Sequence, residues 1–154
     1  MNKKNISLDY VNGLVFDLEK AFWDERGKGA RFRMTHVGRE IYKTQCSPLI
    51  NEPDIDHILS VVKKVLVDNG ILADIEFTRE DQTLRITMKG CLHLPVEEKM
   101  ISMGIEPFTC VPANLIVMAI EDKINRQAEI AEIKTEGGVC QLLIVLFDRP
   151  AKIA

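Results

Sequence analysis

Residues 128–147 read AEIAEIKTEGGVCQLLIVLF, and this stretch decides the fold. Two apolar-rich segments, Ala128 to Thr135 and Val139 to Phe147, flank the pair Gly137-Gly138. Adjacent glycines readily adopt the positive φ angles of a tight β-turn. The stretch therefore predicts an antiparallel β-hairpin.

A second hairpin is predicted between residues 71 and 91. Apolar and polar residues alternate from Ile71 to Thr78 and again from Leu84 to Cys91, on either side of the polar turn E-D-Q at 80–82. Strict alternation turns one face of each strand to the core and the other to solvent. Together the two hairpins predict an antiparallel sheet of about four strands with one buried face.

Five other segments repeat apolar residues at the spacing of an α-helix. Ser7, Thr35 and Asn51 are suited to cap the first three, and Pro53 and Pro112 are allowed in a first helical turn. The predicted order is three helices, a hairpin, two helices and a hairpin, an α+β domain with helices packed over the sheet. The segments are 7–26, 35–45, the stripe from Ile55 to Leu66 that precedes Gly70, 95–103, and Pro112 to Ile124.

Length and composition are those of one globular domain over residues 1–154. Of the 154 residues, 46% are apolar and 28% are charged, which is typical of globular proteins. The formal net charge is −3 and the basic residues are dispersed, so no nucleic-acid-binding surface is predicted. The longest apolar run, Leu142 to Phe147, is too short to span a membrane, and the N-terminal segment lacks the apolar core of a secretion signal.

Four cysteines, at positions 46, 91, 110 and 140, predict a reducing, cytoplasmic location. No C-x-x-C pair is present, so any shared site must be assembled by the fold. Cys91, Cys110 and Cys140 each fall at the end of a predicted element, whereas Cys46 lies in a connector and is interpreted as core filling.

One interpretation is a metal site built on Cys91, Cys110 and Cys140, with His93 and Glu132 as further candidate ligands. Thiolate, imidazole and carboxylate together suit zinc, with iron as the second choice. The last hairpin decides whether Glu132 belongs to this site. A two-residue loop pairs Cys140 with Thr135 and turns Glu132 to the opposite face, whereas a three-residue loop that includes Glu136 places Glu132 and Cys140 on one face. The sequence leaves both loops open.

From about residue 8 to 147 the chain resembles the 4-vinyl reductase domain family, the predicted hydrocarbon-binding domains related to TRAPP-type trafficking subunits. The resemblance rests on PFTCVPANLIVMAIEDKI at 107–124 and on the closing stretch at 128–147. It implies a homodimeric domain with a pocket for a small apolar ligand.

The resemblance also implies a set of metal ligands. Metal-binding members of the family have a cysteine before the helix, a glutamate on the penultimate strand and two cysteines around the last turn. The matching positions here are Cys110, Glu132 and Cys140. The chain has I-K-T-E where the fourth ligand is expected, so the site is either vestigial or completed by Cys91, His93 or Glu136.

A ligand pocket is predicted where the third and fifth helices lie across the sheet. Small and flexible side chains there leave room for a ligand, and the candidate lining is Val62, Leu115, Met118 and Ala119. The alternative is a core filled to native density. Phe22 and Trp23 are adjacent on the first helix and do not both fit one packing face, so a homodimer contact near the N-terminal helices is predicted.

The sequence therefore predicts a small-molecule-binding or sensing domain with a thiolate-rich zinc site. Two alternatives stay open: a metal- or thiol-dependent enzyme acting on a small organic substrate, and a scaffold subunit with a structural hydrophobic channel. An open coordination position would favour the enzyme, and a closed site would favour structure or sensing. The adjacent Glu97 and Glu98 are interpreted as solvated surface residues.

Overall fold

The computed structural model describes residues 5–30 and 35–151 and confirms the predicted α+β class. Helices lead the chain, and the two hairpins follow in the predicted places. The elements are α1 (Leu8–Arg26), a 3-10 turn (Gly27–Gly29), α3 (Arg39–Ile41), a π-helical segment (Tyr42–Cys46), a second 3-10 turn (Ser47–Leu49), α4 (Ile55–Asp68), β1 (Asp74–Glu80), β2 (Thr83–Lys89), α5 (Leu94–Ser102), α6 (Val111–Ile124), β3 (Ala128–Glu136) and β4 (Val139–Leu146).

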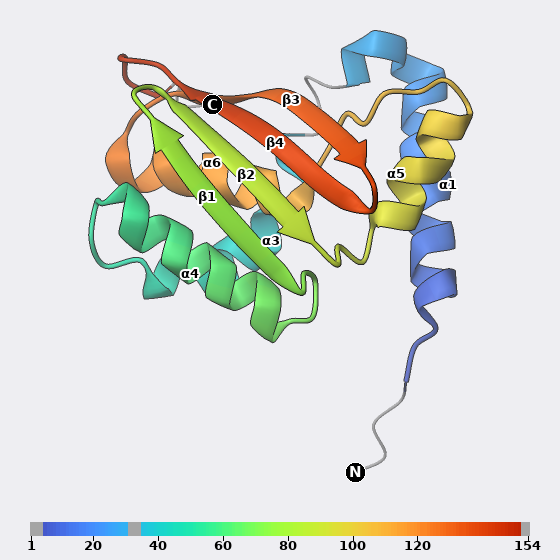
Figure 1. Ribbon diagram of the computed structural model, residues 1–154, viewed down its shortest axis with the longest axis horizontal. Helices are drawn as coiled ribbons and strands as arrows, with labels where there is room; N and C mark the ends of the chain where they lie inside the picture. Colours follow the sequence, from blue (N-terminus) through green and yellow to red (C-terminus); the bar gives the residue numbers. More distant parts are fainter. Residues whose placement is uncertain (1–4, 31–34, 152–154) are drawn as a thin grey trace.

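The strands form one antiparallel sheet in the order β1-β2-β4-β3, so the two hairpins meet along β2 and β4 (Figure 1). This central pairing sets Met88 opposite Cys140. Both face the buried side of the sheet, because alternate residues of a strand point to opposite faces.

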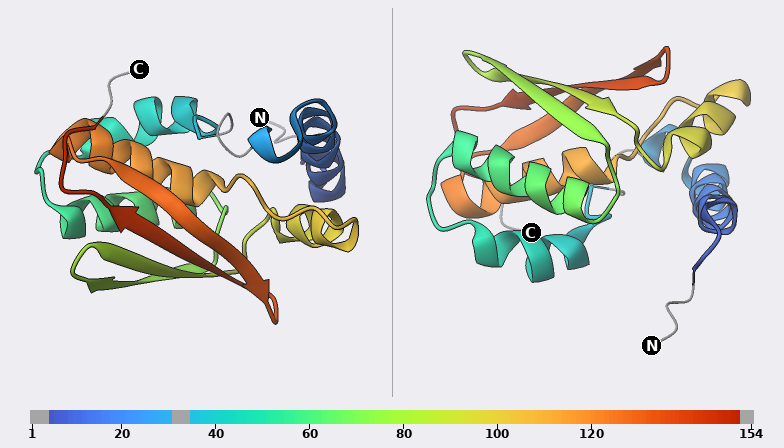
Figure 2. Two further views of the ribbon diagram at one scale, coloured as in Figure 1. Left: turned by 90° about the horizontal axis from the view of Figure 1, so that it is seen from above. Right: turned by 60° about the horizontal axis from the view of Figure 1, so that its bottom comes forward.

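Helices α4 and α6 cover one face of the sheet (Figure 2). The inner strand positions carry buried aliphatic side chains, whereas exposed polar residues such as Glu76, Arg85 and Gln141 occupy the outer face. This alternation is the period-two pattern of the sequence, and burial of its apolar half is the main force that holds the sheet to the helices.

Helices α1 and α5 lie side by side beyond one end of the sheet and form a second unit (Figures 1 and 2). It encloses a smaller apolar cluster in which Trp23 stacks on Phe108 with ring centroids 5.6 Å apart. Phe22 and Trp23 both pack against this cluster, so neither is the outward-facing residue that the sequence predicted. Met100 of α5 and the following residues Ile105 and Phe108 supply the apolar surface against which both rings pack.

The second predicted helix differs most from expectation. Residues 35–38 form a turn, and helical structure begins at Arg39 and continues as the π-helical segment to Cys46. Gly38 has φ +100°, and a Cβ there would lie 3.0 Å from the Val111 side chain. Close approach to α6 therefore fixes the start of the helix in place of the predicted cap at Thr35.

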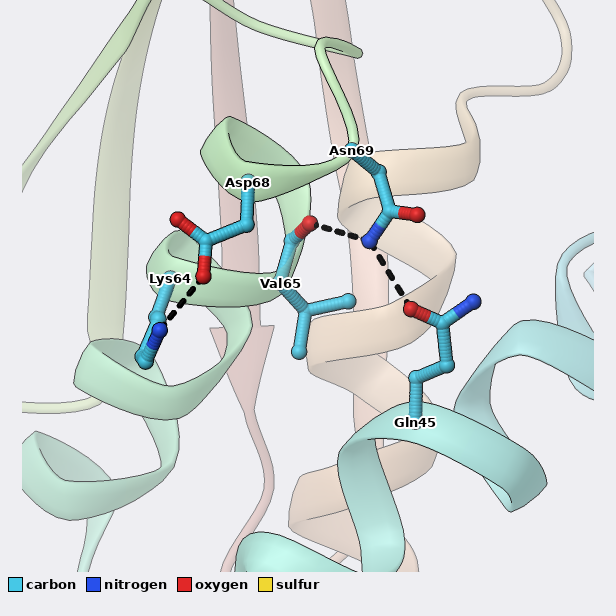
Figure 3. A network of polar contacts seen from close by, with 5 residues as sticks. All are labelled: Gln45, Lys64, Val65, Asp68 and Asn69. Carbon is cyan, nitrogen blue, oxygen red and sulfur yellow. Dashed lines mark hydrogen bonds and ion pairs between the residues drawn. The ribbon is translucent and has the colours of Figure 1, made fainter. Parts of the chain in front are cut away.

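Helix α4 begins after Asp54, whose carboxylate accepts the His57 N–H at 3.0 Å, in place of the predicted cap at Asn51. At its other end, Asn69 Nδ2 donates to the Val65 carbonyl at 2.7 Å and to Gln45 Oε1 at 2.8 Å (Figure 3). The first bond caps the end of α4, and the second ties α4 to the π-helical segment. Within the described residues, no helix combines the length and apolar character needed to cross a bilayer.

Candidate functional site

Cys140 lies one residue after the start of β4 and faces the core. The hairpin has the two-residue loop Gly137-Gly138, and Cys140 pairs with Thr135. The thiol of Cys140 donates to Glu97 Oε2 of α5 at 3.3 Å. A contact between residues 43 positions apart in the sequence therefore joins the sheet to the α1–α5 unit.

Cys91 and Cys110 approach the same place from two other segments. Cys91 follows Gly90 at the end of β2, and Cys110 is the residue that precedes the first turn of α6. Both line a small cavity of about 190 Å³ together with Glu19, His93 and Glu97. We call Cys91, Cys110, Cys140 and Glu97 the thiol–carboxylate cluster.

Burial raises every pKa in this cluster, and repulsion from Glu97 adds to the effect at the three thiols. Removal from water raises the pKa of the Cys110 and Cys140 thiols far above their usual value, and the neighbouring Glu97 carboxylate raises both further. The pKa of Cys91 is raised for the same two reasons. Burial also raises the pKa of Glu97, partly offset by the hydrogen bond from Cys140. In the metal-free protein the thiols are therefore protonated at neutral pH.

Glu97 is the member of the cluster that the sequence interpretation missed, because it was assigned to the solvated surface. Only 8% of Glu97 is exposed, whereas its neighbour Glu98 is exposed as expected. A signal was present, since Glu97 lies three residues before the fully buried Met100 and so shares its helix face. The adjacent carboxylates diverge around the helix, one inward and one outward.

Glu132 is not brought to the cluster. It pairs with Leu143 on the outer face of the sheet, and its carboxylate forms an ion pair with Lys134 at 2.9 Å. The two-residue loop fixes this orientation of Glu132. The register shift between Ile130 and Glu132 lies farther from the loop than Glu132 does, so it does not change the face that Glu132 occupies. The position matched to the glutamate ligand of the 4-vinyl reductase domain family therefore faces away from Cys140.

His93 lies at the entrance to α5, next to the cluster. Its Nδ1 is 3.2 Å from Asn12 Oδ1, and Asn12 Nδ2 donates to the Leu92 carbonyl at 2.9 Å. Burial lowers the pKa of His93, which favours the neutral imidazole. Glu136 pairs with Val139 beside the exposed turn and is not part of the cavity lining.

The donor atoms gathered here, three thiols and a carboxylate, match the chemistry of a zinc site. As they stand, however, no three His, Cys, Asp or Glu side chains of the described ranges are arranged to hold a metal ion. The cluster is therefore a set of candidate ligands that are close to one another without forming a coordination sphere.

Glu19 of α1 faces the same cavity and gives a pH-dependent prediction. Burial, followed by repulsion from Glu97, raises its pKa from 4.5 to about 7. Between these values the folded chain keeps a proton that the unfolded chain releases, so stability falls as pH rises through this window. We expect Glu19→Gln to be more stable than the wild type above pH 7 and equal to it below pH 4.5. Solvent screening limits the difference to roughly 1 kcal/mol.

Urea denaturation of chelator-treated protein at several pH values measures this difference. Glu25→Gln, an exposed glutamate on the same helix, is the matched control and should change stability at neither end of the range. A Glu19→Gln curve that runs parallel to the wild type over the whole window would contradict the assigned burial of Glu19.

A larger cavity, of about 460 Å³, lies between α6, β3 and the turn at 35–36. Its lining is mainly apolar and includes Phe108, Val117, Met118, Ile130 and Ile133. A volume of this size falls within the range of small-molecule sites in proteins, about 300–1,000 Å³.

Of the four predicted pocket residues, the structure places one at this cavity. Met118 lines it, whereas Val62, Leu115 and Ala119 are fully buried in the main core and absent from its lining. The sequence prediction put the ligand between the third and fifth helices, but the side chains of α4 and α6 fill that space. The cavity lies instead on the side of α6 that faces β3.

The sequence matches no model of a known protein family, and no curated protein matches it significantly. Two solved structures are similar to it, to different degrees. One, described as "Probing the function of heme distortion in the H-NOX family", has TM-score 0.53 at 14% identity and covers 100% of this chain and 79% of that chain. The other is a trafficking protein particle complex subunit 3 from Naegleria fowleri covalently bound to palmitic acid, with TM-score 0.39, 11% identity and coverage of 96% and 87%.

At these identities the first likeness concerns the fold alone, and a TM-score of 0.39 is too low for the second to carry an argument. Neither structure singles out the 4-vinyl reductase domain family. The chain has the α+β fold of the H-NOX structure.

Proposed function

We propose that this chain is a domain that binds or senses a small, predominantly apolar molecule in the cavity between α6 and β3. The observation that carries the proposal is the cavity itself, about 460 Å³ of space next to a densely packed core. Small-molecule sites in proteins are mostly apolar hollows of about this size. The description of the H-NOX structure names a heme, and this supports the proposal that a small molecule binds within the same fold here.

A fluorescence titration with N-phenyl-1-naphthylamine, a neutral apolar dye, tests the proposal. The wild type should bind the dye with a dissociation constant in the micromolar range, and Val117→Phe should weaken binding at least about tenfold by filling the cavity. Val67→Phe makes the same change on the exposed face of α4 and should leave binding unchanged. Equal binding by all three proteins would place the dye outside the cavity and contradict the proposal.

We further propose that the thiol–carboxylate cluster binds one zinc ion, or iron as the second choice. Support comes from the Cys140–Glu97 contact of 3.3 Å and from the position of Cys91 and Cys110 on the same cavity. Binding requires the side chains to turn toward one another and the thiols to release their protons. The ligand set then differs from that implied by the family resemblance, with Glu97 in place of Glu132.

A thiol-based enzyme is less well supported. Burial raises the pKa of all three cluster thiols, and a protonated thiol is a poor nucleophile. All four cysteines are buried and unpaired, which supports the proposed reducing, cytoplasmic location.

A homodimer formed through α1 is the proposed assembly. Tyr10, Leu14 and Leu18 recur every four residues on α1 and are 68%, 50% and 63% exposed. They form one apolar stripe on a helix whose other side packs on α5. A second copy would present the same stripe, which a two-fold axis would bury.

Sedimentation velocity at micromolar concentration should therefore give the mass of two chains. The double variant Leu14→Asp and Leu18→Asp should sediment as one chain, because charge in the centre of an apolar interface weakens it by several kcal/mol, at least about a hundredfold in affinity. Leu49→Asp is the control, since Leu49 is 52% exposed and lies outside α1. A monomeric wild type would rule out this assembly.

A further inference from the structure

Two carboxylates, those of Glu121 and Glu129, belong to the lining of the large cavity and lie close enough to repel each other, and we call them its acidic end. Asn114, Val117, Met118 and Glu121 follow the i, i+3, i+4, i+7 spacing, so one face of α6 supplies both apolar and acidic lining residues. Glu121 lies in the last helical turn, where its carboxylate accepts the Ala128 N–H at the start of β3. The carboxylate is thereby held at the edge of the cavity.

In the described part of the chain, negative charge prevails around this end. Glu121 and Glu129 both line the cavity, and the repulsion between them is one of the causes that raise the pKa of Glu121, after burial. Arg149 does not line the cavity, and its Nε donates to Gln127 Oε1 at 2.5 Å. Gln127 in turn donates to Glu129 at 3.0 Å.

His36 is the single basic side chain in the lining among the described residues. It is exposed to solvent, and its attraction lowers the pKa of Glu121 by less than burial raises it. Counted over the residues that the structure describes, the acidic end therefore holds two carboxylates against one solvent-exposed imidazole. Among the described residues, an exposed imidazole is the one basic side chain that faces the partly buried Glu121 carboxylate, and a ligand that brings a full positive charge would reduce the cost of burying this carboxylate.

We propose that the molecule bound in this cavity is apolar with one positively charged amino group, which forms a charge-assisted hydrogen bond with Glu121. This inference rests on the proposed function and specifies the ligand class for the same site. The apolar body of the ligand lies against Val117, Met118 and Ile133, and the ammonium lies at the acidic end.

Three naphthalene compounds of matched shape test the inference by displacing N-phenyl-1-naphthylamine. They are 2-naphthylmethylamine, the neutral 2-naphthylmethanol and the anionic 2-naphthoic acid. We expect the amine to bind about tenfold more tightly than the alcohol and the acid most weakly. Glu121→Gln should weaken the amine about tenfold and the alcohol less than about twofold, because the amide still accepts the Ala128 N–H but carries no charge. Glu76→Gln, an exposed glutamate on β1, is the control and should change neither.

Equal affinity for amine and alcohol, or tighter binding of the acid, overturns the inference and leaves the proposed function standing. An unchanged amine affinity in Glu121→Gln also overturns it, provided the variant unfolds at the same urea concentration as the wild type. If neither the dye nor any of the three compounds binds, the proposed function fails together with the inference.

Discussion

Replacing Gly90 with alanine should destabilise the protein by about 2–4 kcal/mol and disturb the thiol–carboxylate cluster at the same time. Gly90 has φ +66°, a conformation that L-residues adopt with strain. A Cβ at this position would lie 2.6 Å from the Cβ of Ala73 and 3.3 Å from its backbone nitrogen. Ala73 cannot move freely, because its N–H donates to the Lys89 carbonyl at 2.9 Å.

Gly104→Ala separates strain from collision. Gly104 has φ +77°, but nothing lies within 4 Å of its Cβ position, so only the backbone strain of about 1–2 kcal/mol is expected. Urea denaturation of both variants measures the difference. Equal loss of stability in the two variants would show that the segment before Cys91 shifts to accommodate the added methyl group. That result would contradict the close packing of Gly90 against Ala73.

Zinc binding should fall sharply when the cluster is altered, which is the second large effect. Protein purified without chelator from zinc-containing medium should carry about one zinc per chain by elemental analysis. Cys110→Ser and Cys140→Ser should each lose the metal and lower the thermal midpoint, because metal binding energy contributes to folding. Glu97→Gln should weaken zinc at least about tenfold.

Three controls make this result specific. Glu98→Gln changes the exposed neighbour of Glu97, Glu132→Gln changes the residue on the outer face of the sheet, and Cys46→Ser changes the buried cysteine outside the cluster. None of them should change the zinc content. Zinc lost with Glu132→Gln and retained with Glu97→Gln would contradict the ligand set proposed from the structure. A wild type without transition metal would remove the metal proposal and leave the apolar cavity unaffected.

Most of the fold was predictable from local patterns. The period-two alternation of residues 71–91 and the glycine pair at 137–138 both specify hairpins, and the structure confirms them with strand ends displaced by a few residues. The start of the second helix was not predictable, because the contact of Gly38 with Val111 joins positions far apart in the sequence. Only the folded chain shows why a glycine is needed there.

The candidate site was predictable in part, for a similar reason. Cys91 and Cys110 line one cavity, and Cys140 adjoins it through Glu97. The sequence predicted that these cysteines would meet, because each falls at the end of an element. Glu97 was missed because its neighbour Glu98 made the pair resemble a solvated surface. Glu19 was missed because nothing in the sequence of α1 indicates contact with α5. The large cavity depends on how α6 and β3 are spaced, which residue types alone do not determine.

The central claim is that a small apolar molecule binds between α6 and β3, and methyl NMR tests it most directly. Protein with labelled isoleucine, valine and methionine methyl groups is titrated with N-phenyl-1-naphthylamine. The account predicts chemical-shift changes concentrated at Val117, Met118, Ile130 and Ile133, with Val62 and Ile58 in the main core unchanged. Unchanged shifts at all four cavity residues, or changes confined to α1 and the core, would contradict it.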